Sequence, residues 1–306
     1  MNKNNGTLIA HADPAPSAVR FVAIADFSYR TDRRATQDIA EQIDRWGADF
    51  IITMGDNNYP KGEAETIDRN IGQMYQQYIH PYRGAYGAGA DHNRFFPALG
   101  NHDYFTPRAW PYLAYFSHLP GNGRYYDFVW GPCHFFAINS NSEEPDGNSA
   151  DSIQANWLRT QLQNSTAPWK IVYFHSPPYV SNDLHGAAEE MRWPFAEWGA
   201  DLILNGHIHV YERFEVDGIP YIVSGMGGHS IYSFPSWTAE HCVFRYNEEF
   251  GSLFFEADEN HCDVKFMTRY DEVIDQICLT KGSQLTSSSL FYGIRGTELR
   301  QLAISG

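Results

Sequence analysis

Basic residues are scarce in this sequence. There are 22 Lys and Arg against 37 Asp and Glu, which gives a formal net charge of −15 and a pI near 5.2. No cluster of Lys or Arg occurs along the chain, so binding to nucleic acid or to an anionic membrane is not expected. The same net charge means that an anionic substrate would need a local positive centre to overcome the overall repulsion.

Cysteines and long apolar runs are also few. The four cysteines form no CxxC pair, which disfavours a structural zinc site, and they are Cys133, Cys242, Cys262 and Cys278. Their even number allows three disulfide pairings, but each lies in an apolar or strand-like run, so buried free thiols are an equal alternative. No apolar run approaches the roughly 18 residues that a membrane-spanning helix needs.

The two ends of the chain differ from the rest. Residues 1–19 hold a stretch, TLIA, that is too short for the apolar core of a signal peptide, which takes about 7–15 residues. We expect this segment to be a disordered leader, although the Ala-His-Ala before Asp13 leaves the remnant of an export signal open. With no break in composition after it, residues 20–306 are predicted to form a single domain, in which the Ser/Thr-rich stretch 283–289 is left unassigned.

Strand-like and helix-like segments alternate through the first two-thirds of the sequence, and short strands dominate the last third. This pattern predicts an α/β fold with layered mixed sheets. The expected helices cover residues 31–47, 66–82, 152–165 and 189–199, and a hairpin is expected to turn at Gly131-Pro132. The expected strands of the alternating part begin near residues 20, 50, 94, 168 and 200.

Each of these five strands runs into a polar residue that can bind a metal ion. The residues are Asp26, Asp56, Asn101, His175 and the pair His207 and His209. A histidine pair alone could sit on a half-polar surface, since residues i and i+2 of a strand point to the same side. Ligands of α/β sheets bind beyond the carboxyl ends of the strands, however, so five such ends together predict a converging cluster.

Carboxylates, an amide oxygen and imidazoles are ligands for hard or borderline ions such as Mn, Fe or Zn. Six or seven ligands are too many for one tetrahedral zinc ion, but they suit two ions about 3.5–4 Å apart that share a bridging carboxylate. Two ions would also provide the positive centre that an anionic substrate needs on so acidic a chain.

Four short motifs carry a family resemblance. GDNNY (55–59), GNHD (100–103), VYFH (172–175) and GHIH (206–209) occur in this order. Together they resemble the metallophosphoesterase signature, and the tyrosine of GDxxY is similar to that of the purple acid phosphatases of the tartrate-resistant type. The resemblance implies a four-layer α/β/β/α sandwich with two mixed β-sheets, and an extracytoplasmic location.

The resemblance also implies a ligand set. Asp26, Asp56, Tyr59 and His209 would hold a ferric ion, and Asp56 would bridge to a divalent Fe, Zn or Mn held by Asn101, His175 and His207. The first motif reads Asp26-Phe27-Ser28 where the family usually has Asp-x-Gly. It lacks the Asp-x-His of other metallophosphoesterases, which fits Tyr59 as the replacement ligand.

Two further histidines are expected to face the substrate, a small-molecule phosphate ester. His102 follows Asn101 in its motif and is the candidate general acid, and His185 lies ten residues after His175, where plant-type relatives carry another such histidine. His229, in GMGGHS, follows a strand and could reach the same crevice, but the interpretation preferred here gives it no role in the site.

The implied reaction is hydrolysis of a phosphate monoester, in which a metal-bound hydroxide attacks phosphorus and His102, alone or together with His185, protonates the leaving oxygen. A phosphodiesterase or nucleotide hydrolase would use the same ligands. A non-catalytic phosphate sensor is the alternative from another class, and the presence of all seven candidate ligands disfavours it.

Overall fold

The computed structural model describes residues 18–27 and 34–281. Of the expected leader, only residues 18 and 19 are described, and Val19 is already the first residue of a strand. The unassigned stretch 283–289 lies outside the described residues, as does Ser28 of the first motif.

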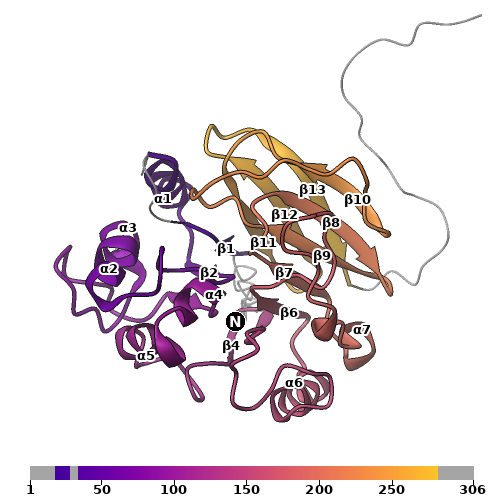
Figure 1. Cartoon of the computed structure of the whole chain (residues 1–306), viewed down its shortest axis with the longest axis horizontal. Helices are drawn as coiled ribbons and strands as arrows, with labels where there is room; N and C mark the ends of the chain where they lie inside the picture. The colour runs from indigo at the N-terminus through magenta and orange to yellow at the C-terminus, as the bar shows by residue number, and fades with distance from the viewer. Residues whose placement is uncertain (1–17, 28–33, 282–306) are drawn as a thin grey trace, which may run out of the picture.

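Two mixed β-sheets form the centre of the fold (Figure 1). The first has the order β13-β12-β11-β1-β2-β3 and the second β10-β8-β9-β7-β6-β5-β4. The first contains β1 (Val19–Ile24), β2 (Phe50–Thr53), β3 (Phe95–Pro97), β11 (Gly251–Ala257), β12 (His261–Thr268) and β13 (Val273–Thr280). The second contains β4 (Tyr126–Trp130), β5 (Cys133–Ala137), β6 (Trp169–Phe174), β7 (Leu202–Asn205), β8 (Tyr211–Val216), β9 (Ile219–Ser224) and β10 (Cys242–Tyr246).

Parallel pairing lies in the middle of both sheets. In the first sheet β1, β2 and β3 are parallel, and β11 to β13 extend β1 with antiparallel pairs. In the second, β5, β6, β7 and β9 are parallel, with antiparallel strands at both edges. The parallel strands are almost wholly buried, as expected for strands that are covered on both faces.

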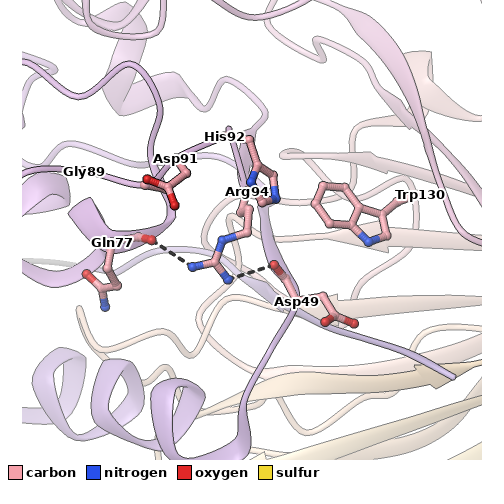
Figure 2. A pocket seen from close by; sticks show the side chains of 8 residues that line it. Asp49, Gln77, Gly89, Asp91, His92, Arg94 and Trp130 are labelled. Atoms are coloured by element: carbon pink, nitrogen blue, oxygen red, sulfur yellow. Dashed lines mark hydrogen bonds between the residues drawn. The ribbon is translucent and has the colours of Figure 1, made fainter. Parts of the chain in front are cut away.

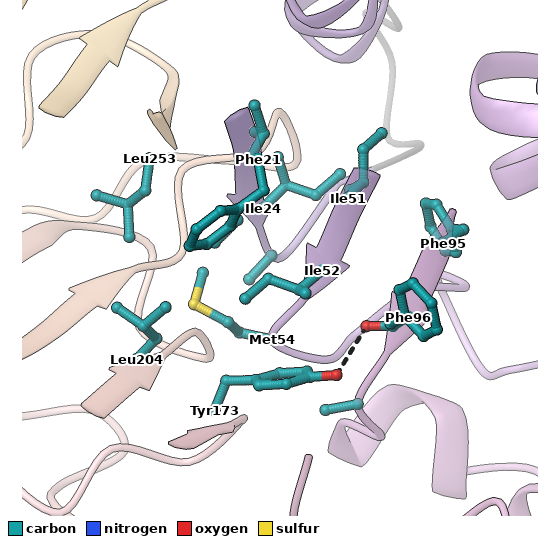
Figure 3. Packing of buried hydrophobic residues seen from close by; sticks show 14 of the residues in the cluster. Phe21, Ile24, Ile51, Ile52, Met54, Phe95, Phe96, Tyr173, Leu204 and Leu253 are labelled. Atoms are coloured by element: carbon teal, nitrogen blue, oxygen red, sulfur yellow. Dashed lines mark hydrogen bonds between the residues drawn. The ribbon is translucent and has the colours of Figure 1, made fainter. Parts of the chain in front are cut away.

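Helices cover the outer faces of the sheets, and aromatic side chains fill the space between them. Phe135 of β5 makes edge contacts with Phe21 of β1 and Phe50 of β2, at centroid distances of 5.0 and 5.3 Å. The hydroxyl of Tyr173 on β6 donates a hydrogen bond to the carbonyl of Phe96 on β3, which also joins the two sheets (Figure 3). This arrangement confirms the predicted α/β sandwich.

The helices are short apart from α1 (Arg34–Trp46) and α6 (Ile153–Asn164). Trp46 of α1 packs on Phe254 of the first sheet, while α6 and α7 pack on the outer side of the second. The remaining elements are α2 (Ala64–Ile67), η1 (Asp68–Gly72), α3 (Gln73–Tyr75), η2 (Gln76–Tyr78), α4 (Asn101–Tyr104), η3 (Pro107–Ala109), α5 (Trp110–Tyr115), η4 (Glu189–Met191) and α7 (Phe195–Trp198). None of the helices in the described ranges combines the length and the apolar character that crossing a membrane requires.

Two sequence expectations need correction. The helix expected over 189–199 is broken into η4 and α7, because Pro194 disfavours helical geometry at Trp193 and has no N–H to donate. The third strand ends at Pro97, so that Asn101 begins the short helix α4 instead of ending a strand.

All four cysteines are free thiols. Cys133 and Cys262 are buried, as the sequence suggested, but Cys242 is half-buried and Cys278 is exposed. Cys278 points outward because β13 is an edge strand whose side chains alternate between the sheet interior and solvent.

Candidate metal centre

The carboxyl ends of the central strands meet at one place. Asp26 lies just after β1 and Asp56 just after β2, while His175 directly follows β6 and His207 lies just after β7. Since β1 pairs with β2 and β6 with β7, both in parallel, these side chains share the same edge of the sandwich. The predicted convergence of strand ends is therefore present.

Three of the predicted residues form a compact group. Asp26, Asp56 and His175 are all buried, and each offers a ligand atom within 4.8 Å of the others. His175 Nε2 lies 3.2 Å from Asp56 Oδ1.

Tyr59 and His209 lie on one side of this group. The Tyr59 hydroxyl is 2.9 Å from Asp26 Oδ1, 2.9 Å from Asp56 Oδ2 and 3.2 Å from His209 Nε2. His209 Nε2 is also 3.3 Å from Asp26 Oδ1. A phenol oxygen, two carboxylate oxygens and an imidazole nitrogen are thus gathered around one point.

Asn101 and His207 lie on the other side. Asn101 Oδ1 is 3.0 Å from His175 Nε2, and His207 Nδ1 is 3.2 Å from the same nitrogen. The structure therefore brings all seven residues predicted as metal ligands into one network of contacts, in which Asp56 touches both sides.

The backbone of this site is held in a rarely used conformation. Asp26, Asp56 and His207 have φ angles of 55°, 53° and 70°, which non-glycine residues seldom adopt outside turns and functional sites. The glycines of the motifs are required by close packing. A Cβ on Gly55 would lie 2.6 Å from Nδ1 of His175, and a Cβ on Gly100 would lie 2.2 Å from the backbone N of Asp56.

Hydrogen bonds outside the cluster fix the orientation of its imidazoles. His175 Nδ1 donates to the carbonyl of Met54 at 2.8 Å, which directs Nε2 towards the cluster. His209 Nδ1 lies 2.6 Å from Ser230 Oγ, so that Nε2 points to Tyr59. Such outer partners are typical of metal-binding histidines, because they set which nitrogen is free.

Two buried carboxylates make the site negatively charged, and this charge shifts the pKa values of the neighbouring groups. Burial alone would raise the pKa of Asp56, but the charge of His175 beside it holds that pKa below its usual value. Burial alone would lower the pKa of His175, yet Asp56 and Asp26 raise it to about 9. Burial, with the charges of Asp26 and Asp56, raises the pKa of Tyr59 well above its usual value. Among the described residues only histidines form ion pairs with the two carboxylates.

This donor set fits a pair of metal ions. Two buried carboxylates, three imidazoles, an amide and a phenol, with no Lys or Arg among the described ion-pair partners of the carboxylates, are the ligands of a hard or borderline cation. A cation would also satisfy charges that the protein leaves in a low-dielectric interior.

His102 lies where a substrate-facing residue is expected. Its Nδ1 donates to the carbonyl of Pro60 at 2.6 Å, and its Nε2 is 3.9 Å from Asp56 Oδ2. The side chain is 28% exposed, whereas Asp56 is buried. His102 therefore places one free ring nitrogen between the cluster and solvent.

His185 reaches the rim of the cluster. Its ring centroid is 5.1 Å from that of His207, and the residue is exposed. The partial burial of its ring beside the cluster, followed by the charge of His209, lowers the pKa of the His185 side chain. Both histidines that were expected to face the substrate are thus on the open side.

The segment after β9 has no role in the sequence interpretation, which considers His229 and sets it aside. The ring of His229 stacks on Tyr59 at 3.9 Å, and the ring of Tyr232 stacks on His209 at 4.4 Å. The backbone N of His229 donates to the carbonyl of Asp26. The available signal was the pair of glycines before His229, since a Cβ on Gly227 would lie 2.2 Å from the carbonyl of Ala25.

A separate cavity of about 480 Å³ lies beside β3, the edge strand of the first sheet, away from the metal ligands (Figure 2). Asp49 and Arg94 in its wall directly precede β2 and β3, at the ends opposite to those that carry Asp56 and Asn101. The Arg94 guanidinium donates to the carbonyls of Asp49 and Gln77. This cavity contains none of the predicted site residues.

Residues 19–211 match the calcineurin-like phosphoesterase family. The chain belongs to this family.

Relatives within it are named purple acid phosphatases. One from Glycine max is 28% identical and covers 67% of this chain and 46% of its own length. Purple acid phosphatase 17 of Arabidopsis thaliana is 26% identical and covers 73% of both chains. The tartrate-resistant acid phosphatase type 5 of Rattus norvegicus is 24% identical and covers 72% of this chain and 76% of its own.

The chain thus spans about half the length of the first plant relatives, at 46%. Among solved structures, the purple acid phosphatase PPD1 of yellow lupin superposes with a TM-score of 0.69 at 18% identity, covering 86% of this chain and 54% of that one. GAP50, the anchor in the inner membrane complex of Plasmodium, gives 0.65 at 18% identity, covering 87% and 90%. The phosphoesterase fold and the resemblance to purple acid phosphatases are confirmed.

Proposed function

We propose that the protein hydrolyses phosphate monoesters at a centre of two metal ions, in the manner of a purple acid phosphatase. The observation that carries this proposal is the single contact network of all seven predicted ligands, on a phosphoesterase fold. Family membership gives the class of reaction, and the neighbouring histidines supply groups for proton transfer.

The contacts support a division into two ligand sets. The Tyr59 hydroxyl lies against Asp26, His209 and Oδ2 of Asp56. His175 Nε2 lies against Oδ1 of Asp56, Asn101 and His207. Asp56 therefore presents one carboxylate oxygen to each set, as a bridging ligand should.

The proposed ions differ in charge. A phenolate is a hard anionic donor that favours a hard trivalent ion, so we assign Fe(III) to the set with Tyr59. The other set would hold divalent Fe, Zn or Mn. When bound, two such ions supply the positive charge that neutralises the phosphoryl oxygens and lowers the pKa of an attacking water molecule.

The protein's own residues would handle the leaving group. His102 presents Nε2 at the open side of the cluster while Nδ1 is held by Pro60, so a protonated His102 can donate from Nε2 to the departing alkoxide oxygen. His185, at the rim beside His207, would donate a hydrogen bond to the ester or to a phosphoryl oxygen. Asp26 and Asp56 are themselves buried, so bulk water does not reach them.

Metal analysis combined with a substrate panel tests the proposal. We expect two ions per chain and a higher kcat/KM for 4-nitrophenyl phosphate than for bis(4-nitrophenyl) phosphate. A higher kcat/KM for bis(4-nitrophenyl) phosphate would show that the protein is a phosphodiesterase instead of a monoesterase. Metal-loaded protein that turns over neither ester would support a non-catalytic role on a fold that the GAP50 anchor shares. The extracytoplasmic location stays a prediction.

A further inference from the structure

A cavity of about 430 Å³ lies next to the candidate metal centre, between residues 182–184 and 231–235. Tyr232 connects the cavity with the metal centre, because it lines the cavity and its ring stacks on His209 at 4.4 Å. Leu184, in the opposite wall, directly precedes His185, whose ring is 5.9 Å from that of Tyr232. A molecule with its phosphate at the metal ligands would therefore extend its organic group towards this cavity.

The lining of the cavity is mainly apolar. Its walls are formed by Leu184, Ile231, Tyr232, Phe234 and Pro235, with Asn182, Asp183 and Ser233 as the polar members. An aromatic ring could stack on the aromatic side chains and bury its faces against the aliphatic ones.

The charge at the cavity is negative. Asp183 lines it, and no Lys or Arg is among its lining residues in the described part of the chain. The guanidinium of Arg245 lies 4.9 Å from the Phe234 ring, but Arg245 is not among the residues that line the cavity, so Asp183 is the charged group that a bound molecule would contact. An organic group with further phosphate or carboxylate charges would be repelled by Asp183 and would find no Lys or Arg in the lining to pair with.

Hydrogen bonds hold the two walls in place. Trp237 Nε1 donates to Asp183 Oδ1 at 2.6 Å, and the backbone N of Ala239 donates to Ser181 Oγ at 2.9 Å. The backbone N of Ser181 donates in turn to the buried carboxylate of Glu212 on β8. The cavity is thus formed before a ligand arrives, which reduces the entropy cost of binding.

We propose that this cavity binds the leaving group of the substrate and selects uncharged aromatic groups over groups that carry additional negative charge. The proposal rests on the proposed phosphatase function. It assigns aryl-type monoesters as the preferred substrate class and disfavours nucleoside di- and triphosphates and other polyanions.

The first test compares phenyl phosphate with 2-naphthyl phosphate, whose leaving groups have similar acidity. Wild type should prefer the naphthyl ester by about tenfold in kcat/KM, since the second ring buries additional apolar area. Leu184→Ala should reduce that preference about fivefold. Val129→Ala is the matched control, because Val129 is an exposed aliphatic residue on β4 that does not line the cavity.

The second test concerns charge. Asp183→Asn keeps an oxygen for Trp237 Nε1 but removes the negative charge. It should raise kcat/KM for 4-carboxyphenyl phosphate, relative to phenyl phosphate, about threefold. Asp217→Asn, in the exposed turn between β8 and β9, changes the net charge equally and should leave the ratio unchanged.

The outcomes separate this proposal from the proposed function. Turnover with the same substrate ratios in wild type, Leu184→Ala and Asp183→Asn would overturn the cavity assignment and leave the phosphatase in place. Absence of turnover by metal-loaded wild type would overturn the phosphatase. In that case calorimetric binding of benzylphosphonate and 2-naphthylmethylphosphonate decides the cavity: tighter binding of the naphthyl compound, lost in Leu184→Ala, supports it, and equal binding overturns it.

Discussion

The ring of His229 lies on the ring of Tyr59, with centroids 3.9 Å apart and planes inclined by 26°. His102 contacts Tyr59 as well, at 4.3 Å and 51°. Two histidines therefore fix the plane of a buried tyrosine whose hydroxyl touches both Asp26 and Asp56. This packing holds the phenol oxygen at the point where the proposed ferric ion needs its fourth ligand.

Tyr59→Phe should abolish the colour of the iron-loaded protein. A phenolate bound to Fe(III) gives a visible charge-transfer band, and phenylalanine has no oxygen to bind. The fold should be kept, because the ring still fills its place between His229 and His102. Absorption spectra with iron analysis provide the measurement, and a colourless wild type with stoichiometric ferric iron would show that Tyr59 is not a ligand.

His229 gives a second spectroscopic prediction. His229→Ala exposes one face of Tyr59 to water, and hydrogen bonding of water to the phenolate should move the band to shorter wavelength. His229→Phe retains a flat ring on Tyr59 and should leave the band in place. An identical band in wild type and His229→Ala would mean that the stacked ring has no influence on the phenolate.

Asp56 should be more important for metal retention than Asn101. Asp56 presents one oxygen to each ligand set, whereas Asn101 contacts only the set with His175. Asp56→Asn should therefore deplete both ions, and Asn101→Ala mainly one. Elemental analysis per chain checks this, and two ions retained in Asp56→Asn would contradict the bridging assignment.

Much of this site was predictable because strand ends are local features of sequence. Apolar runs that stop at Asp26, Asp56 and His175 identify buried strands, and parallel strands bring such ends together without further information. The pairing of β11 with β1 was not predictable, because it joins residues more than 200 positions apart. His229 was set aside for the same reason, since its contact with Tyr59 depends on a turn after β9 packing against the end of β1.

Metal binding should release protons at neutral pH. The pKa of His175 is raised to about 9, so the metal-free protein carries a proton there at pH 7, and a metal ion needs the neutral ring. The raised pKa of Tyr59 keeps the phenol protonated, so its coordination releases another proton. Apparent metal affinity should therefore fall as the pH falls below 9, by about tenfold per unit for each proton released.

The number of protons released on metal binding separates the contribution of Tyr59 from that of His175. Calorimetric titration with ferric nitrilotriacetate, in two buffers of different ionisation enthalpy, counts the protons released on loading. Tyr59→Phe should release about one proton fewer than wild type, and the contribution of the chelator cancels in this comparison. Equal counts in the two proteins would mean that Tyr59 stays a phenol when the site is loaded.

The last prediction concerns His102 as general acid. An alkoxide is a poor leaving group that needs a proton as the P–O bond breaks, whereas nitrophenolate leaves readily without one. General acid catalysis typically contributes about 10²–10⁴-fold, so His102→Ala should lower kcat/KM for an alkyl phosphate towards the upper part of that range. The loss for 4-nitrophenyl phosphate should be clearly smaller, because only hydrogen bonding to the phosphoryl group disappears.

Metal analysis of His102→Ala separates this role from a structural one. The His102 side chain is held by Pro60, and its contact with Asp56 Oδ2 is long, at 3.9 Å, so the metal content should be unchanged. A residue that only positioned Asp56 or Asn101 would cause equal losses for both substrates, together with a loss of metal. That result would reject the acid role, because a missing proton donor cannot slow a leaving group that does not need one.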